Sequence, residues 1–131
     1  MDKQLKYSVL LCEDDPINRE AAFRILSRRF EKVYIAQNGI EAFNIFNWHK
    51  IDVVVTDITM PEIDGLTLVR DIRAKNRHIP VVIMSAHDEK EYFLQAIDSG
   101  VNQYVIKPIV ASKLIRAVHK VLGIIDHEGL E

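Results

Sequence analysis

The chain has 131 residues, of which 48% are apolar and 27% charged, and its formal net charge at pH 7 is −2. A chain of this length forms one domain around a single hydrophobic core. The small net charge gives no overall attraction to nucleic acid or to anionic membranes, and no apolar run approaches the roughly 20 residues that span a bilayer. Cys12 is the single cysteine. An internal disulfide is therefore excluded, and we expect a reducing, cytoplasmic compartment.

Five short apolar runs alternate with five amphipathic segments along the chain. Runs rich in Val and Ile are typical of buried parallel strands, whereas apolar residues spaced three and four apart indicate helices. In chain order, the runs and the apolar residues of the helical segments are 9–12; Ile17, Ala21, Ile25 and Leu26; 33–36; Ile40, Phe43 and Phe46; 53–55; Leu68, Val69 and Ile72; 81–84; Phe93, Leu94 and Ile97; 104–106; and Leu114, Ile115, Val118 and Leu122. Lys32 and Gln37 flank the second run, which suits a more exposed strand.

Strict alternation of strand and helix predicts an α/β fold with five parallel strands and helices on both faces of the sheet. We expect a doubly wound (βα)5 three-layer sandwich, for which the flavodoxin-like order 2-1-3-4-5 is a candidate. Ligand sites in such sheets lie at the carboxyl ends of the strands, where the winding reverses. We expect the domain to occupy residues 1–125, followed at 126–131 by a disordered tail or a cloning remnant.

Acidic, hydroxyl and basic side chains follow four of the five runs. Glu13-Asp14-Asp15 follows the first run, Asp57 the third, Ser85 the fourth and Lys107 the fifth. Taken alone, each is more simply a turn residue, a helix cap or a solvated charge. In the order 2-1-3-4-5, however, the four strand ends are neighbours. The side chains are then expected to converge on one site.

Converging carboxylates repel one another, so they either take up protons or hold a cation. Oxygen ligands without cysteine or histidine favour a hard ion, Mg²⁺ first, with Mn²⁺ as an acceptable substitute. A carboxylate beside such an ion can attack phosphorus. Lys107 would offset the charge of the incoming group, and the Ser85 hydroxyl would donate to a phosphoryl oxygen. The pattern thus predicts phosphoryl transfer, which needs mainly positioning and charge stabilisation.

The segments that carry these residues resemble the receiver domain of two-component response regulators, the CheY-like superfamily, over nearly the whole chain. The resemblance rests on LCEDDP at 11–16, VVTDITMPEIDG at 54–65, MSA at 84–86 and VIKP at 105–108. GIEA at 39–42 and AIDSGV at 96–101 also fit. Each motif alone is weakly informative, whereas their order and spacing are highly specific.

The resemblance implies that Asp57 is the phosphorylation site. Asp14 is implied as a direct metal ligand, Glu13 as a ligand through water, and the backbone carbonyl of Thr59 as a further ligand. Asp15 falls just outside the family's acidic pair and is left off the ligand set. The domain would catalyse phosphoryl transfer to itself, and the hydrolysis that follows, without being a conventional enzyme. The donor would be a histidine kinase or a phosphotransfer protein.

Four further roles follow from the resemblance. Ser85 and Lys107 take the family's hydroxyl and lysine positions, and the peptide bond between Lys107 and Pro108 is expected to be cis, which is inexpensive only before proline. Thr59 and His87 stand where the family varies, and we expect them to tune the lifetime of the phosphorylated state. An exposed loop histidine is the simpler interpretation of His87.

The family switch couples the hydroxyl position to an aromatic residue on the fifth strand, here Ser85 and Tyr104. Phosphorylation would change the surface built by the fourth helix, fifth strand and fifth helix, which would control an output domain, a partner protein or a homodimer. No membrane contact and no direct binding of nucleic acid by this domain are expected. Core burial is the default expectation for most of the apolar residues on those segments, which are Phe93, Leu94, Val110 and Leu114.

Three alternatives stand beside this interpretation. A degenerate receiver would keep the fold as a phosphorylation-independent interaction module. A flavodoxin-like cofactor binder would need a Ser/Thr/Gly-rich phosphate cradle where this chain has three acids, which repel phosphate. A phosphatase with an aspartyl nucleophile normally has a second acid two residues on, where this chain has Thr59. We expect Cys12 to be a small buried hydrophobe. The remaining histidines are expected at the surface, and they are His49, His78, His119 and His127.

Overall fold

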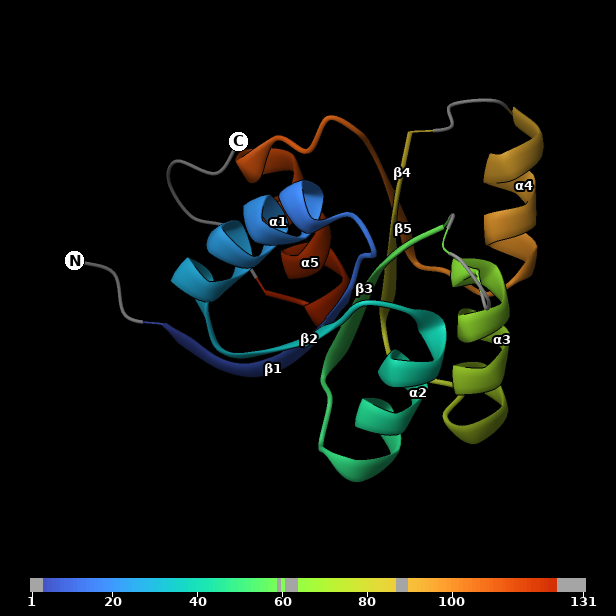
Figure 1. The fold of residues 1–131 in the computed structure, drawn as a ribbon, viewed down its shortest axis with the longest axis horizontal. Coiled ribbons are helices and arrows are strands. Elements are labelled where there is room, and N and C mark those ends of the chain that lie inside the picture. Colours follow the sequence, from blue (N-terminus) through green and yellow to red (C-terminus); the bar gives the residue numbers. More distant parts are fainter. Residues whose placement is uncertain (1–3, 59, 61–63, 87–89, 125–131) are drawn as a thin grey trace.

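The computed structural model describes residues 4–58, 60, 64–86 and 90–124, with only the backbone of 90–93. Ten elements alternate as predicted (Figure 1). The strands are β1 (Leu5–Cys12), β2 (Phe30–Ala36), β3 (Val53–Asp57), β4 (Val81–Ser85) and β5 (Gln103–Ile106). The helices are α1 (Pro16–Arg29), α2 (Gly39–Trp48), α3 (Gly65–Lys75), α4 (Lys90–Asp98) and α5 (Ala111–Leu122). The strands are longer than predicted, so Asp57 and Ser85 end their strands rather than follow them.

The five strands form one parallel sheet in the order β2-β1-β3-β4-β5. This confirms the predicted doubly wound fold and places the exposed second strand at an edge. The carboxyl ends of β1, β3, β4 and β5 lie along one rim of the sheet because all strands run in the same direction. The sequence-predicted site residues therefore share that rim.

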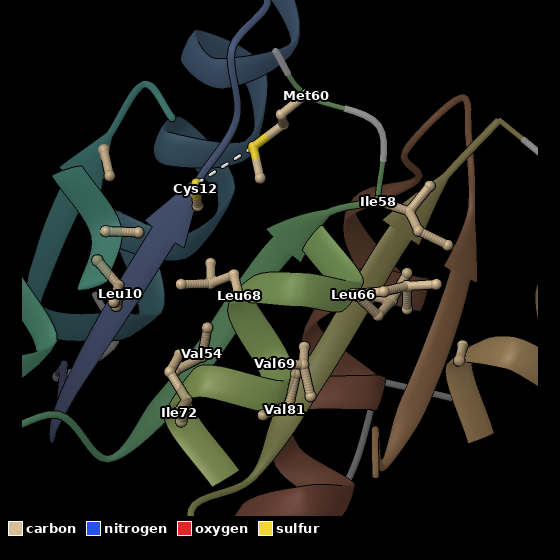
Figure 2. Packing of buried hydrophobic residues seen from close by; sticks show 14 of the residues in the cluster. Leu10, Cys12, Val54, Ile58, Met60, Leu66, Leu68, Val69, Ile72 and Val81 are labelled. Carbon is tan, nitrogen blue, oxygen red and sulfur yellow. Dashed lines mark hydrogen bonds between the residues drawn. The ribbon is translucent and has the colours of Figure 1, made fainter. Parts of the chain in front are cut away.

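Two hydrophobic clusters sandwich the sheet. One lies under α1 and α5 and contains residues such as Leu26 and Leu114. The other lies under α2, α3 and α4, where Leu68 and Ile72 of α3 pack against Leu10 and Val54 of the sheet (Figure 2). Strands buried on both faces explain why their sequences read as continuous apolar runs rather than alternating ones.

Side-chain caps set where three helices begin. Asp15 accepts a hydrogen bond from the Asn18 backbone N–H at 2.8 Å, and Pro16 opens α1. Asn38 and Asp64 cap α2 and α3 in the same way. A capping side chain satisfies one of the free N–H groups of the first turn. Leaving Asp15 off the ligand set agrees with its role as a cap.

Cys12 is buried at the end of β1, and its Sγ lies 3.3 Å from Met60 Sδ (Figure 2). Burial raises the pKa of the Cys12 thiol to about 12. A thiol with such a pKa is hardly ionised at neutral pH, so it is a poor nucleophile. The expectation of a small buried hydrophobe is confirmed.

The predicted buried face of α1 was partly wrong. Ile17 is 80% exposed, and the fully buried residues of this helix are Ala22 and Leu26. The stripe through Ile17, Ala21 and Ile25 is offset by one residue from the buried stripe, which rotates it by roughly 100° on a helix. Ala21 is consequently exposed and lines an open groove between α1 and α5, whereas Ile25 lines the same groove and also packs partly buried against the core.

Other apolar residues expected in the core are also exposed. Leu94 of α4 and Val110 before α5 are each 47% exposed, whereas Leu114 is buried as expected. Ile40 and Ile97 are about half exposed. Among the described side chains of the short helices α2 and α4, only those of Ala42 and Ala96 are buried against the sheet. Gly39, at the start of α2, is also buried. Small residues there bring the helix close and leave the flanking large residues at its sides.

His119 is fully buried, which corrects its expected surface position, while His49 and His78 are exposed. His119 lies in the last turn of α5, where Arg29 Nε donates to its Nε2 at 3.1 Å and the Phe30 ring packs edge-on against it. A single histidine without the spacing of metal ligands gives no sequence signal that distinguishes a buried position from an exposed one. His127 and the tail 126–131 lie outside the described residues. Within the described part of the chain, no helix combines the length and apolarity needed to cross a bilayer.

Candidate functional site

Three carboxylates meet at the carboxyl rim of the sheet. One oxygen from each of Glu13, Asp14 and Asp57 lies within 4.8 Å of the others. Glu13 and Asp14 follow β1, and Asp57 ends the neighbouring β3, so strand pairing brings them together across 44 residues of sequence. Glu13 is 1% exposed and Asp57 is 7% exposed. Acids buried this deeply are rare without a compensating charge.

Lys107 supplies one compensating charge. Its Nζ lies 2.9 Å from Glu13 Oε1 and 3.2 Å from Asp57 Oδ2. The residue follows β5, its backbone N–H donates to the Ser85 carbonyl at 2.7 Å, and the bond to Pro108 is cis, as expected. One ammonium shared by two carboxylates leaves the cluster with a net negative charge.

The crowding is visible in the pKa values of both partners. Burial raises the pKa of Glu13 to about 7, opposed by the hydrogen bond from Lys107 and reinforced by the negative charge of Asp57. Burial alone would lower the pKa of Lys107, but the bond to Glu13 and the charge of Asp57 outweigh it and raise that pKa. The lysine therefore stays charged, and its single positive charge does not balance the carboxylates at the rim.

Backbone groups hold the acids in place. The Ile58 N–H donates to Asp57 Oδ1 at 2.8 Å, and the Asp15 N–H donates to Glu13 Oε2 at 3.1 Å. Arg19 Nη1 donates to the carbonyl oxygens of Glu13 and Asp14, at 3.0 and 3.2 Å. The pattern analysis did not single out Arg19. Its position one helical turn beyond the Asp15 cap was the available signal.

The sequence analysis also gave Gly65 no role of its own, although it is the last residue of the motif at 54–65. Its N–H donates to the Ile58 carbonyl at 2.8 Å, so α3 begins against the end of β3. A Cβ at position 65 would lie 2.0 Å from the Asp57 backbone oxygen and 2.9 Å from the Ile58 Cα. Only glycine allows the helix this close to the segment that carries Asp57.

The predicted switch residues lie on one face of the sheet. Ser85 is fully buried at the end of β4 and directly follows Met84, the β4 partner of Asp57. Tyr104 of β5 pairs in register with Ile83, two residues before Ser85, and is half-buried against the cluster under α3. Because side chains alternate along a strand, Ser85 and Tyr104 point to the same face. Thr59 and His87 lie outside the described residues.

The donor set suits a hard divalent cation. Three carboxylates supply only oxygen ligands, and their charge exceeds what Lys107 neutralises. Mg²⁺ is commonly bound through one or two carboxylates and completes its shell with water and phosphate oxygens. The acid cluster is therefore compatible with a metal site at the rim.

These features define an α/β domain with an acid cluster at the carboxyl rim of a doubly wound sheet. The family model of the response regulator receiver domain matches residues 9–119. The chain belongs to this family.

Similarity to individual proteins agrees. The chain is 30% identical over 120 residues to the chemotaxis protein CheY of Bacillus subtilis, covering 91% of this chain and all of that protein. It is 31% identical over 114 residues to the response regulator MprA of a Mycobacterium species, covering 87% of this chain but 50% of that protein. The structure of the response regulator TrrA of Thermotoga maritima, in complex with Mg²⁺ and BeF, superposes with a TM-score of 0.79 at 29% identity, covering 90% of this chain and all of that chain.

The matched segment thus spans the whole of some relatives and about half of others. The receiver fold is common to both groups.

Proposed function

We propose that this receiver domain accepts a phosphoryl group on Asp57 in a two-component phosphorelay. The supporting observation is the cluster of Glu13, Asp14 and Asp57, in which the two buried carboxylates of Glu13 and Asp57 share Lys107 and that of Asp14 is partly exposed. This arrangement lacks positive charge beside Asp57, the proposed nucleophile. The family membership agrees with a histidine kinase or a phosphotransfer protein as the donor.

In the proposed reaction, an Asp57 oxygen attacks the phosphorus of a phosphohistidine. The new P–O bond forms as the P–N bond breaks, and its electron pair returns to the imidazole, which takes up a proton. The Ile58 N–H, 2.8 Å from Oδ1, fixes the carboxylate rotamer. Lys107 Nζ, 3.2 Å from Oδ2, would stabilise the negative charge that develops on the phosphoryl oxygens. The Ser85 hydroxyl would be a further hydrogen-bond donor to them. Hydrolysis would later return the carboxylate and release phosphate.

Asp14 and Asp57 would hold Mg²⁺ directly, Glu13 through water, and the Thr59 carbonyl would add a ligand from outside the described residues. When bound, the ion supplies positive charge that neutralises the carboxylates and the phosphoryl oxygens. Arg19 keeps the Glu13 and Asp14 backbone in position from the side of α1. The domain acts on itself, so we propose a self-phosphorylating switch rather than a conventional enzyme.

The proposed output is a change at the surface formed by α4, β5 and α5. Four of the eight large apolar residues that are exposed in the described part of the chain lie on or beside these elements, and they are Leu94, Ile97, Ile106 and Val110. Exposed apolar groups gathered in one region are typical of a protein contact site. A buried Ser85 drawn toward a phosphoryl group, with Tyr104 on the same face, would link the site to this surface.

Intact-mass spectrometry after incubation with acetyl phosphate and Mg²⁺ tests the proposal. We expect a gain of one phosphoryl group that requires the metal and is absent in Asp57→Asn. The matched control is Asp98→Asn, which changes an exposed acid on α4 and should leave the gain intact.

Other outcomes separate the alternatives. Mg²⁺ binding without any mass gain would identify a degenerate receiver, an interaction module that does not use phosphate. Steady release of phosphate from external phosphomonoesters would identify a phosphatase. A mass gain that persists in Asp57→Asn would place the acceptor elsewhere and overturn the assignment.

A further inference from the structure

Arg73 of α3 donates hydrogen bonds to several carbonyl oxygens at the opposite, amino-terminal rim of the sheet. Its Nε and Nη2 donate to the Gly100 carbonyl at 3.2 and 2.8 Å, just beyond the end of α4. Its Nη1 donates to the Ile79 carbonyl, just before β4, and Nη2 also reaches Asn102 Oδ1 at 3.0 Å. A planar guanidinium can hold several acceptors in fixed directions, which an ammonium cannot do.

Two asparagines extend this network. Asn102 Oδ1 also accepts from the Val81 N–H at 2.8 Å, and the Asn102 N–H donates to the Val81 carbonyl at 2.8 Å. Asn76 Oδ1 accepts from the backbone N–H groups of His78 and Ile79. The residues that precede β4 and β5 are thus tied to each other and to α3. We call Arg73, Asn76, Gly100 and Asn102 the Arg73 cluster.

Gly100 is shaped for this contact. Its φ of 91° lies in the left-handed region, and a Cβ there would come within 3.1 Å of Arg73 Nε. The Val101 N–H donates back to the Ala96 carbonyl, which closes the last turn of α4. Glycine at this position therefore ends the helix and also lets the guanidinium approach its carbonyl.

The helix that this cluster holds has little other attachment among its described side chains. Of the α4 positions 94–98, only Ala96 is buried, whereas α3 buries five residues, among them Leu68 and Ile72. A methyl group gives far less apolar contact than a leucine or isoleucine side chain. Apart from Ala96 and the partly buried Val101 that follows the helix, polar contacts to the flanking turn therefore hold the carboxyl end of α4.

We propose that Arg73 is a positioning residue for signalling, which anchors the carboxyl end of α4 so that a change at the acid cluster moves this helix about Gly100 as a rigid unit. The inference rests on the proposed function, because it concerns how the α4, β5 and α5 surface responds. Without the anchor, the same signal would loosen α4 instead of turning it. The burial that lowers the pKa of Arg73 agrees with a structural role for its charge.

The test compares Arg73→Gln with the wild type by NMR, before and after addition of Mg²⁺ and beryllofluoride, a phosphoryl analogue. We expect amide exchange at 96–101 in the resting variant to rise roughly 3- to 10-fold, because the Arg73 hydrogen bonds no longer oppose local opening of this segment. The beryllofluoride-induced shifts of Ala96, Gly100 and Tyr104 should shrink, while Mg²⁺ affinity at the acid cluster stays unchanged.

Three further variants keep the result interpretable. Arg77→Gln removes an exposed charge from the same end of the molecule and should behave like the wild type. Ile72→Val weakens α3 packing beside Arg73 and controls for a general loss of stability. Gly100→Ala perturbs the same contact from the opposite side and should reproduce the Arg73→Gln result.

Two outcomes would overturn the inference in different ways. If Asp57 and Ile58 respond to beryllofluoride and the α4 shifts are the same in Arg73→Gln and the wild type, Arg73 is not the anchor. If Ile72→Val reproduces the loss of the α4 response, the effect is one of stability alone. If the wild type shows no response at Asp57, the proposed function itself fails, whereas the resting amide exchange still reports on the anchor.

Discussion

The two rims of the sheet differ in how their charged side chains are balanced. At the carboxyl rim, Glu13, Asp14 and Asp57 crowd around one lysine and retain excess negative charge. At the amino rim, one guanidinium is surrounded by neutral oxygens of Ile79, Gly100 and Asn102. The first arrangement is compatible with an added cation, whereas the hydrogen bonds of the second are all made within the chain.

This difference separates the rim that is suited to bind a ligand from the rim that keeps the fold rigid. Repelling carboxylates lower stability unless a ligand joins them, so the rim that carries them can respond to one. A satisfied polar network in a partly buried position rigidifies its surroundings. The same sheet thus has a responsive rim and a fixed rim, joined by the strands and by α4.

Replacement of Gly65 should have the largest effect. In Gly65→Ala the added methyl would overlap the Asp57 backbone oxygen at 2.0 Å, so α3 or the end of β3 must move. We expect a loss of about 3 kcal/mol or more in unfolding free energy, measured by urea denaturation. Gly123→Ala is the control, because nothing lies within 4 Å of its Cβ and only its φ of 73° is strained. A loss in Gly65→Ala no larger than in the control would contradict the close approach.

The pH dependence of stability tests the crowding at the carboxyl rim. The pKa of Glu13 is raised from 4.5 to about 7 in the folded state, so the folded protein binds more protons than the unfolded one between these values. Stability in EDTA should therefore fall as pH rises from about 4.5 to about 7, by up to ~3 kcal/mol from this group. Saturating Mg²⁺ should remove the fall, and Glu13→Gln should flatten it. A stability in EDTA that rises with pH and is unchanged by Glu13→Gln would contradict this assignment.

Removal of Lys107 should increase the demand for a metal. In Lys107→Met the carboxylates of Glu13 and Asp57 lose their shared cation, and we expect about 2 kcal/mol less stability in EDTA at pH 8. Added Mg²⁺ should raise the melting temperature of this variant more than that of the wild type. Lys113→Met, an exposed lysine on α5, is the control. Equal stabilisation of both proteins by Mg²⁺ would show that Lys107 does not compensate the cluster.

The buried histidine near the fixed rim should give the smallest effect. His119→Leu keeps an apolar body against Phe30 but removes the acceptor for Arg29 Nε. We expect a loss of about 1 kcal/mol, because the half-exposed guanidinium can turn to solvent. Mg²⁺ binding should not change. His49→Leu, at an exposed position, controls for the substitution itself. A change in Mg²⁺ affinity would show that the two rims are less independent than their contacts indicate.

The helix faces show where sequence patterns stop being informative. The apolar residues of α3 were correctly predicted to be buried, because Leu68, Val69 and Ile72 form a single stripe. In α1 two apolar stripes lie side by side, and periodicity does not tell which one faces the sheet. Leu94 of α4 was predicted to be buried on the same reasoning and is half exposed, because Ala96 occupies the contact position.

The sequence by itself determined the parallel sheet, its order and the rim at which acids, serine and lysine gather. Strand and helix periodicities are local properties, and the ends of parallel strands must share an edge. Only the tertiary structure decided which contacts complete the two rims. Arg73 and His119 contact groups 27 and 90 residues away in sequence, and a local pattern holds no record of such partners. Gly65 and Arg19 contact backbone groups only a few residues away, but their contacts are made where the end of a strand packs against the next helix. Their roles depend on distances of a few ångströms, which the packing of the whole chain sets.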